Sequence, residues 1–381
     1  MHYLDHAATT PVLPEVKDAM LGALEADFGN PSSVHAYGRR AKEIVEDARD
    51  RVAAAVGASP AEIVFTGGGT EADNLALKGS AHKLRGNGNH LVTTTIEHHA
   101  VLDTVEWLMR EGLETTKVPV AATGVVDPTA FADAVRTSTI LASVMAVNNE
   151  IGTVQDVSAI AAEVKSANPN TLVHTDAVQA LGNIPVNLHA WGVDLAAFAA
   201  HKLGGPKGVG ALFIRSSVPV EAIIHGGGQE RGLRSGTLNV SGIAGFGAAA
   251  EIAAKEVYEK SERVAGLRDR LLTGIREIVP DAVINGDLHK RVAGNINLCI
   301  PGTEGETLLL LLDQAGIACS SGSACSSGAL DPSHVLLAIG VSRDLARGSL
   351  RFSLGRASTD GDVDAVLAAL PGVVAAARRA G

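Results

Sequence analysis

The chain has 381 residues, of which 46% are hydrophobic and 19% are charged, and its formal net charge is −10 at pH 7. This length allows two or three domains with large cores, and the acidic balance argues against a direct, tight nucleic-acid interaction. Because no apolar run reaches about 18 residues and the start is neither basic nor apolar, we expect an unexported, cytoplasmic protein that spans no membrane.

Short β-branched runs alternate with longer helical patterns through the first two-thirds of the chain. The strand-like runs lie at residues 62–66, 90–96, 139–147, 171–177 and 193–200. Ala-rich segments with apolar residues at helical spacing lie between them. This alternation predicts an α/β fold with a mainly parallel, buried sheet.

A helical pattern from about Ile243 to Leu272 follows and has the length of a connector between domains. Beyond it, strand-like NINLCIP and SLRFSLG and a closing helix at DVDAVLAAL predict a smaller α+β domain. We therefore predict a large domain at residues 14–260 and a small domain formed by residues 1–13 and 261–381. A Gly/Ser-rich loop at about 319–332 belongs to the small domain.

Ligands in open α/β sheets bind where the strands end, so polar residues after each strand-like run are candidates. The first run is followed by three glycines and Thr70, where backbone N–H groups at a helix start favour an anion. Two alternatives stay open: a plain tight turn, or a dinucleotide-binding pattern with Glu97 as its ribose ligand.

Polar residues also follow the next three runs: Glu97, His98 and His99, then Asn148, Asn149 and Glu150, and then Asp176 and Gln179. The adjacent histidines do not form an H-E-x-x-H arrangement, so we predict no metal site. For the histidines and for Asp176, a helix cap without further function is the alternative.

Lys202 follows the fifth run, and Lys207 in the same segment competes with it. Partial desolvation disfavours an ammonium and so prepares a lysine amine to form a Schiff base, whereas a surface lysine is the alternative. A phosphate cradle, a residue that can stack, an Asn/Gln pair, a carboxylate and a lysine are together the groups that bind pyridoxal 5′-phosphate (PLP). A nicotinamide enzyme has no use for a buried lysine.

Motifs along nearly the whole chain extend this interpretation, namely YLDHAATTPV, FGNPSS, IVFTGGGTEADNLALKG, EHHAVLD, VNNEIGTVQ, HTDAVQA, HKLGGPKGVGAL, HGGGQERGLRSGT, NGD, SSGSACSSGALDPSHVL and SLRFSLGR. They resemble the NifS/IscS-like cysteine desulfurases of the class-V aminotransferase family. The resemblance implies PLP-dependent fold type I, with a mainly parallel seven-stranded sheet flanked by helices and a smaller α+β domain. It also implies conversion of L-cysteine to L-alanine.

The resemblance assigns cofactor roles to this chain's residues. Lys202 would form the Schiff base and later remove the α-proton, His98 would stack on the ring and assist proton transfer, and Asp176 would pair with the ring nitrogen. Gln179 and Asn149 would contact the ring oxygen and the substrate. The phosphate would be held by Gly69, Thr70 and His201.

Two further assignments concern the partner subunit and the substrate. Thr237 would reach the phosphate of the neighbouring subunit, which implies a homodimer. Arg351 would bind the substrate carboxylate in bidentate fashion, with a surface ion pair as the alternative because Arg347 and Arg356 lie close in sequence.

The three cysteines have different surroundings and are too few for a disulfide framework, which favours a reducing compartment. Cys325, in a Gly/Ser-rich loop, would be the nucleophile that accepts sulfur as a persulfide. Cys299 lies in a strand-like run and is expected in the core. Cys319 is either buried like Cys299 or a second persulfide acceptor.

Two departures from the family's pattern affect these expectations. Ala199 stands where relatives usually have a phosphate-binding serine, and the chain ends at RRAG without the tail that housekeeping relatives use for a scaffold. The sulfur acceptor, an iron–sulfur scaffold or a thiolation factor, therefore stays open. A selenocysteine lyase or a small-amino-acid aminotransferase shares the cofactor residues, but the Cys325 loop argues against both. A sulfur-relay scaffold without catalysis is the remaining alternative.

Overall fold

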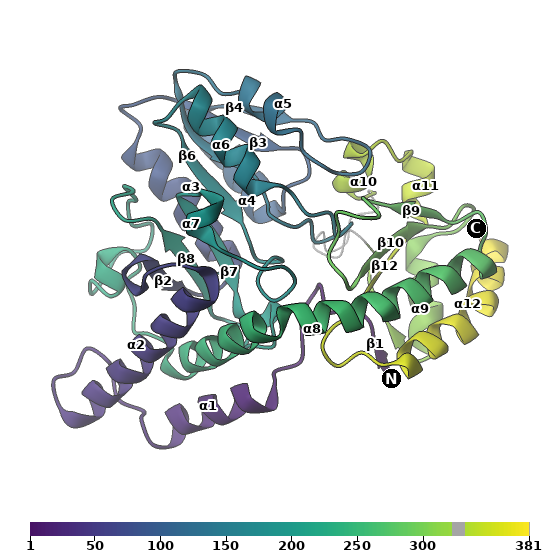
Figure 1. Ribbon diagram of the computed structural model, residues 1–381, viewed down its shortest axis with the longest axis horizontal. Coiled ribbons are helices and arrows are strands. Elements are labelled where there is room, and N and C mark those ends of the chain that lie inside the picture. The colour runs from purple at the N-terminus through teal and green to yellow at the C-terminus, as the bar shows by residue number, and fades with distance from the viewer. Residues whose placement is uncertain (322–331, 381) are drawn as a thin grey trace.

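The computed structural model describes residues 1–321 and 332–380, and its largest sheet has seven strands in the order β2-β8-β7-β6-β5-β3-β4 (Figure 1). These strands are β2 (Ile63–Thr66), β3 (His90–Thr94), β4 (Glu114–Val118), β5 (Thr139–Ser143), β6 (Leu172–Asp176), β7 (Leu195–Ala199) and β8 (Gly210–Ile214). Strand β8 is antiparallel to both neighbours, and the other pairs are parallel. The predicted fold class is therefore confirmed.

Helices cover both faces of this sheet, which explains why every residue of its strands is buried except in the edge strand β4. One face packs against α3 (Gly69–Lys83) and α4 (His99–Arg110). The other packs against α2 (Ala36–Val56), α5 (Pro128–Asp133), α6 (Val157–Ala167) and α7 (Leu188–Trp191). Helix α1 (Pro14–Glu25) lies outside this layer and packs against α8 (Val240–Ile278).

A second, antiparallel sheet has the order β12-β10-β9 and a separate core. Its strands are β9 (Val283–Asn285), β10 (Asn295–Cys299) and β12 (Ser349–Ser353). Helices α9 (Gly305–Gln314) and α12 (Asp360–Ala380) contribute to this core, and the short strands β1 (His2–Tyr3) and β11 (Ile317–Ala318) pair in parallel nearby. The short helices α10 (His334–Ala338) and α11 (Arg343–Arg347) precede β12.

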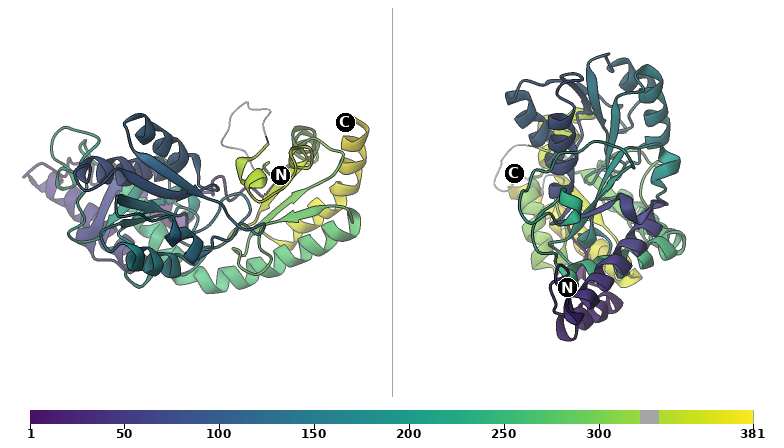
Figure 2. Two further views of the ribbon diagram at one scale, coloured as in Figure 1. Left: turned by 90° about the horizontal axis from the view of Figure 1, so that it is seen from above. Right: turned by 90° about the vertical axis from the view of Figure 1, so that its left-hand side faces the viewer.

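Helix α8 (Val240–Ile278) has 39 residues and runs along both cores, as Figure 2 shows. Ile243 and Phe246 belong to the core under the large sheet, whereas Val264 and Leu271 belong to the core of the small sheet. The connecting helix is thus longer than its sequence pattern predicts, and the domain boundary near residue 260 stays a prediction. Within residues 1–321 and 332–380, no helix is both long and apolar enough to cross a membrane.

Candidate active site

The predicted cofactor residues come from adjacent strand ends of the large sheet. Asp176 is the last residue of β6, and Lys202 follows β7 in a single 3-10 turn, Ala200–Lys202. His98 follows β3 and Asn149 follows β5. Because parallel strands end on the same edge, these residues gather where ligands bind in such sheets.

The turn between β2 and α3 forms one wall of a cavity at this edge. Its lining includes Gly69, Thr70 and His201, all three predicted to hold phosphate, together with Gly67, Gly68 and Lys207. The backbone N–H groups at the start of the 15-residue helix α3 favour an anion there. Glu71 in the same turn is paired with Arg234, 2.8 Å away, which offsets its negative charge.

Two glycines give this turn its shape. Gly68 has φ +154° and ψ −179°, a conformation that is essentially restricted to glycine. A Cβ atom on Gly69 would lie 2.6 Å from Cγ2 of Val178 and 3.4 Å from Cβ of Ala199. Ala199 is buried, and its methyl group packs next to Gly69. It has no hydroxyl group that could donate to an anion.

The N-terminal segment crosses the strand ends and receives the side chain of Lys202. The Lys202 amine donates to the carbonyl oxygens of Ala7 at 2.7 Å and Ala8 at 2.8 Å. Nε2 of Gln179 donates to the same Ala7 oxygen at 2.9 Å. The segment is held in turn by Ser353, whose Oγ accepts from the Ala7 N–H.

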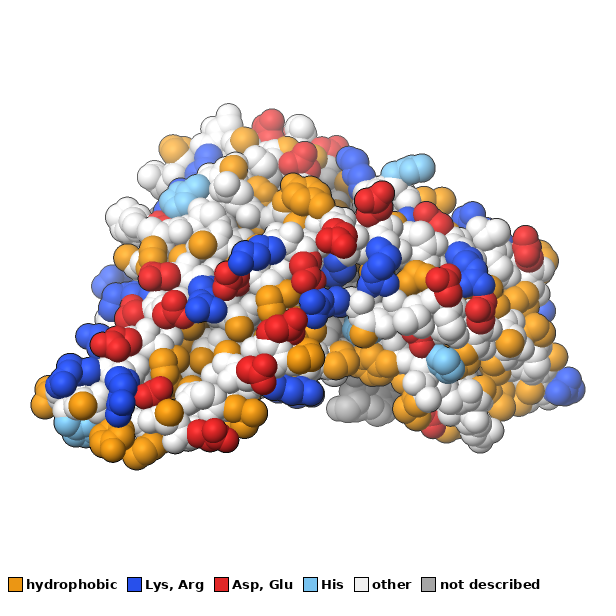
Figure 3. Space-filling model, turned by 60° about the horizontal axis from the view of Figure 1, so that its bottom comes forward, with side chains coloured by type: hydrophobic (Ala, Val, Ile, Leu, Met, Phe, Trp, Pro, Cys, Tyr) orange, Lys and Arg blue, Asp and Glu red, His pale blue; other side chains and the backbone are white. Residues whose placement is uncertain are grey.

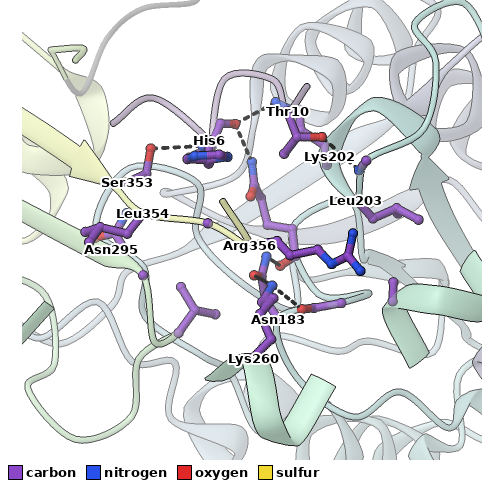
Figure 4. Close-up of a pocket in the computed structure, with 18 of the residues that line it drawn as sticks. His6, Thr10, Asn183, Lys202, Leu203, Lys260, Asn295, Ser353, Leu354 and Arg356 are labelled. Atoms are coloured by element: carbon purple, nitrogen blue, oxygen red, sulfur yellow. Dashed lines mark hydrogen bonds between the residues drawn. The ribbon is translucent and has the colours of Figure 1, made fainter. Parts of the chain in front are cut away.

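A second cavity lies beside this segment and reaches helix α8 (Figure 4). Its lining includes His6, Lys202, Lys260 and Arg356. The Lys260 amine donates to Asn183 Oδ1 at 2.9 Å, and burial lowers the pKa of Lys260 to about 8. Burial together with the charge of Lys260 lowers the pKa of His6 to about 4. The sequence pattern gave no signal for Lys260, because it lies inside a helix that reads only as a connector.

Asp176 is almost fully buried beside two other acids. Its Oδ1 accepts from the Val178 N–H at 2.9 Å, and burial raises its pKa while the charges of His98 and Lys202 lower it. Asp73 of α3 is also buried, and its pKa is raised by burial and by the charges of Asp176 and Glu97. Nothing in the helical pattern of α3 marked Asp73 as a neighbour of the site.

Glu97 is fully buried and cannot reach a bound ribose, so the structure gives no support to the dinucleotide alternative. Its Oε1 accepts from Thr94 Oγ1 at 2.6 Å and from the Met145 N–H at 3.0 Å. Burial raises the pKa of Glu97 to about 8 despite these hydrogen bonds. Glu97 therefore links the turn that carries His98 to the backbone of Met145.

His98 is the N-cap of α4, and its Nδ1 accepts from the Ala100 N–H at 3.1 Å. This bond places the ring proton of a neutral His98 on Nε2. His98 therefore does cap the helix, as one of the two interpretations predicted. The capping bond fixes the orientation of the ring and is compatible with a second role at the strand ends. His99 points elsewhere and pairs with the exposed Asp103.

Arg351 lies on β12 and is only 2% exposed, unlike the exposed Arg347. Its Nη1 donates to the Asn149 carbonyl at 2.8 Å, and its Nη2 pairs with Asp5 Oδ1 at 2.9 Å. Its Nε has no hydrogen-bond partner among the described residues. Arg351 therefore forms a buried pair beside Asn149, and not the surface ion pair that was the alternative.

Cys325 lies outside the described residues. Cys299 is buried in β10 and accepts a hydrogen bond from Asn285 Nδ2 at 3.2 Å, as expected for a core position. Burial and the charge of Asp5 raise the pKa of Cys319 to about 12, which makes this thiol a poor nucleophile. Thr237 is exposed in the loop before α8.

Within the part of the chain that the structure describes, no three His, Cys, Asp or Glu side chains are grouped as metal ligands would be. The predicted residues Asn149, Gln179 and Lys202 meet at the second cavity, and Gly69, Thr70 and His201 meet at the first. The strand-end site thus combines a glycine-rich turn at a helix start, a buried carboxylate and a lysine.

Comparison with known proteins agrees with this arrangement. The family model "Aminotransferase class-V" matches residues 2–366. The IscS-like cysteine desulfurase of Mycobacterium tuberculosis is 47% identical over 387 residues, covering 100% of this chain and 98% of that protein. Cysteine desulfurase IscS of Clostridium botulinum (strain Hall) is 46% identical, covering 98% and 94%. A solved NifS-like protein is 41% identical with a TM-score of 0.93, covering 98% and 100%. The chain therefore belongs to the class-V aminotransferase family and, within it, to the cysteine desulfurases.

Proposed function

We propose that this protein is a PLP-dependent cysteine desulfurase that converts L-cysteine to L-alanine and transfers the sulfur to Cys325. The observation that carries the proposal is the convergence of Lys202, Asp176 and the Gly67–Thr70 turn on one edge of the sheet. Membership of the class-V aminotransferase family implies PLP, and the names of the relatives imply the substrate.

The residues at the strand ends fit this cofactor. The start of α3 at Gly69 and Thr70 offers backbone N–H groups to the phosphate, and His201 lines the same cavity. The buried carboxylate of Asp176 suits a protonated ring nitrogen, since the two charges would neutralise each other. Once bound, PLP supplies an electron sink for the negative charge that develops at the substrate α-carbon.

The chain's own residues perform the proton and binding steps. Nζ of Lys202 would take the α-proton of the substrate as general base. Nε2 of His98 would assist proton transfer, since its Nδ1 already accepts a hydrogen bond from the Ala100 N–H. Arg351 binds the substrate carboxylate, which competes with Asp5 for the guanidinium. Asn149 and Gln179 are proposed contacts for the substrate and the ring oxygen.

Sulfur transfer requires a thiolate, and we assign it to Cys325. The thiolate attacks the substrate sulfur, an S–S bond forms, and the C–S bond breaks with its electron pair left on the carbon fragment. That fragment takes up a proton and leaves as L-alanine. L-Cysteine and an enzyme thiol thus become L-alanine and an enzyme persulfide, without an external oxidant.

The same proposal includes a homodimer and a cytoplasmic sulfur-acceptor protein, either an iron–sulfur scaffold or a thiolation factor. Exposed apolar side chains at the end of the molecule formed by α1 and α2 support a second copy: Leu21, Leu24, Phe28, Val34 and Tyr37 (Figure 3). Thr237, which is exposed, would reach the phosphate bound by the partner.

The test is L-alanine released from L-cysteine by PLP-loaded protein with a reductant, beside the Cys325→Ser variant. We expect alanine and a protein-bound persulfide from the parent, and almost none of either from the variant. No alanine from a parent that carries PLP, or full activity in the variant, would overturn the assignment. Parallel assays with L-selenocysteine, and with an amino donor plus a keto acid, would identify a lyase or an aminotransferase.

A further inference from the structure

Ser333 links the start of α10 to the turn that follows β5. Its hydroxyl donates to Glu150 Oε2 at 2.5 Å, and its Oγ accepts from the N–H groups of Val335 and Leu336 at 3.1 and 3.2 Å. Ser333 is 3% exposed and Glu150 is 5% exposed. The hydroxyl thus caps a helix and at the same time satisfies one oxygen of a buried carboxyl group.

The backbone of Glu150 is held by the loop that follows β5 and by strand β10 of the small sheet. Its N–H donates to Asn148 Oδ1 at 2.9 Å, and its carbonyl accepts from Nδ2 of Asn295 at 3.1 Å and of Asn297 at 3.3 Å. The preceding residue is Asn149, whose carbonyl binds Arg351. Ser333, which is bound by Glu150, is therefore fixed relative to Asn149 and Arg351, the two residues proposed to contact the substrate.

The next residue of α10 contacts a second turn of the site. Nε2 of His334 donates to the carbonyl of Glu97 at 3.0 Å, immediately before His98. The His334 ring also lies edge-on to His99, with ring centres 5.0 Å apart. The first residues of α10 are therefore bound to both turns that carry His98 and Asn149.

These contacts fix the chain on one side of the segment that contains Cys325. On the other side, Ser320 pairs with Arg351 through N–H···O bonds of 3.2 and 2.6 Å. Cys325 is five residues after Ser320 and eight before Ser333.

We propose that Glu150 and Ser333 are positioning residues for the sulfur-transfer step, because they fix one attachment of the Cys325 segment to the turn that holds Asn149. The inference rests on the proposed desulfurase function. Neither residue is assigned a part in cofactor binding or α-proton removal, so their loss should affect a later step than the loss of Lys202 or Arg351.

A helix cap of the same kind provides a matched control. Ser342 caps the neighbouring helix α11, its Oγ accepting from the Leu345 N–H at 3.3 Å, and it is exposed. Ser333→Ala and Ser342→Ala each remove a serine cap from a five-residue helix, but the first also removes the donor to Glu150. Ser333→Thr keeps the hydroxyl.

The experiment separates two steps in PLP-loaded protein mixed with L-cysteine. The absorbance change of the cofactor reports substrate binding and α-proton removal, and quenched samples report L-alanine and Cys325 persulfide. For Ser333→Ala we expect at least tenfold slower alanine and persulfide formation, with the absorbance phase and its cysteine dependence within twofold of the parent. Ser333→Thr and Ser342→Ala should stay within threefold of the parent in both readouts.

Glu150 provides a second, independent set of variants. Glu150→Gln keeps an oxygen acceptor for Ser333 and should stay within threefold of the parent. Glu150→Ala should match Ser333→Ala, and the double variant should be no slower than either single variant. An active parent whose Ser333→Ala variant equals Ser342→Ala, or is slowed equally in the absorbance phase, would overturn this inference alone. A PLP-loaded parent that releases no alanine would overturn the proposed function and this inference with it.

Discussion

The side-chain nitrogen of Lys202 lies 2.7 Å from the carbonyl oxygen of Ala7, a residue 195 positions earlier in the chain. A second carbonyl, that of Ala8, lies 2.8 Å from the same nitrogen. Carbonyl oxygens can only accept, so this pair favours a nitrogen that carries protons. The N-terminal segment therefore provides the hydrogen-bond acceptors for the Lys202 amine when this amine forms no covalent bond to a ligand.

Lys202→Ala tests the role of this amine. We expect turnover to fall at least about 100-fold, because the general base is lost. The variant should also lose the covalent link to PLP, seen as no borohydride-fixed label in the protein by mass spectrometry. Lys255→Ala, which removes an exposed lysine paired with Glu251, should keep both. A fixed label in Lys202→Ala would assign the link to another lysine.

Arg351→Lys tests the carboxylate contact. A lysine cannot reproduce the two parallel donors of a guanidinium, so we expect kcat/KM for L-cysteine to fall about 10- to 100-fold. Most of the change should appear in KM, because the residue is proposed to bind the substrate before reaction. The exposed Arg347→Lys should match the parent. An unchanged KM in Arg351→Lys would place the substrate carboxylate elsewhere.

Gly68→Ala tests the anion-binding turn through its backbone. The φ of +154° disfavours any residue with a Cβ by about 1–3 kcal/mol, although the space around that atom is open. We expect PLP to bind about 10- to 100-fold more weakly, measured by fluorescence titration of apo protein. Gly86 is exposed, also has open space, and has no unusual φ, so Gly86→Ala is the control. Equal affinities would contradict a phosphate role for the turn.

The contribution of Glu97 to the stability of the fold should decrease as pH rises. Its pKa is about 8 in the folded chain against 4.5 as the ordinary value, so the native state retains a proton that the unfolded chain has lost. Between pH 4.5 and 8 this carboxyl group binds more protons in the native state than in the unfolded chain, so its contribution to the free energy of unfolding falls across this window. Burial raises the pKa of Glu150 to about 7, which contributes in the same direction.

Glu97→Gln isolates the contribution of Glu97 to the pH dependence of the free energy of unfolding, since the amide imitates a carboxyl group that keeps its proton. We expect the loss of unfolding free energy between pH 5 and pH 8 to shrink by up to about 4 kcal/mol relative to the parent. Urea unfolding at the two pH values measures it. Parallel pH dependences in parent and variant would show that Glu97 is ionised in the folded protein.

The sequence predicted the strands whose residues are buried on both faces, because such strands read as unbroken apolar runs. The runs at 139–147 and 171–177 contain β5 and β6. Strand β4 was missed because it is partly exposed at the sheet edge and its sequence, ETTKV, carries two charges. Strand β8 follows a glycine-rich turn and was not separated from it by pattern alone.

The residues of the site, like the strands, could be predicted from the sequence only in part. Residues directly after strands were identifiable because the topology of a parallel sheet brings strand ends together. Contacts between distant segments left no local signal: Asp73 beside Asp176, the Ala7 carbonyl on Lys202, and Glu150 with Ser333, which lie 183 positions apart. Sequence periodicity reports which face of an element is buried, but not which element it faces.

Helix α8 contributes side chains to both cores, so the number of residues between these side chains determines how the two cores are oriented relative to each other. Its 39 residues span about 58 Å, with Phe246 in one core and Val264 in the other. Inserting a single residue between these two positions would turn everything beyond it by about 100° and advance it by about 1.5 Å. Arg351 could then no longer meet the carbonyl of Asn149. The number of residues along this helix is thus as strict a requirement for the site as the identity of any side chain in it.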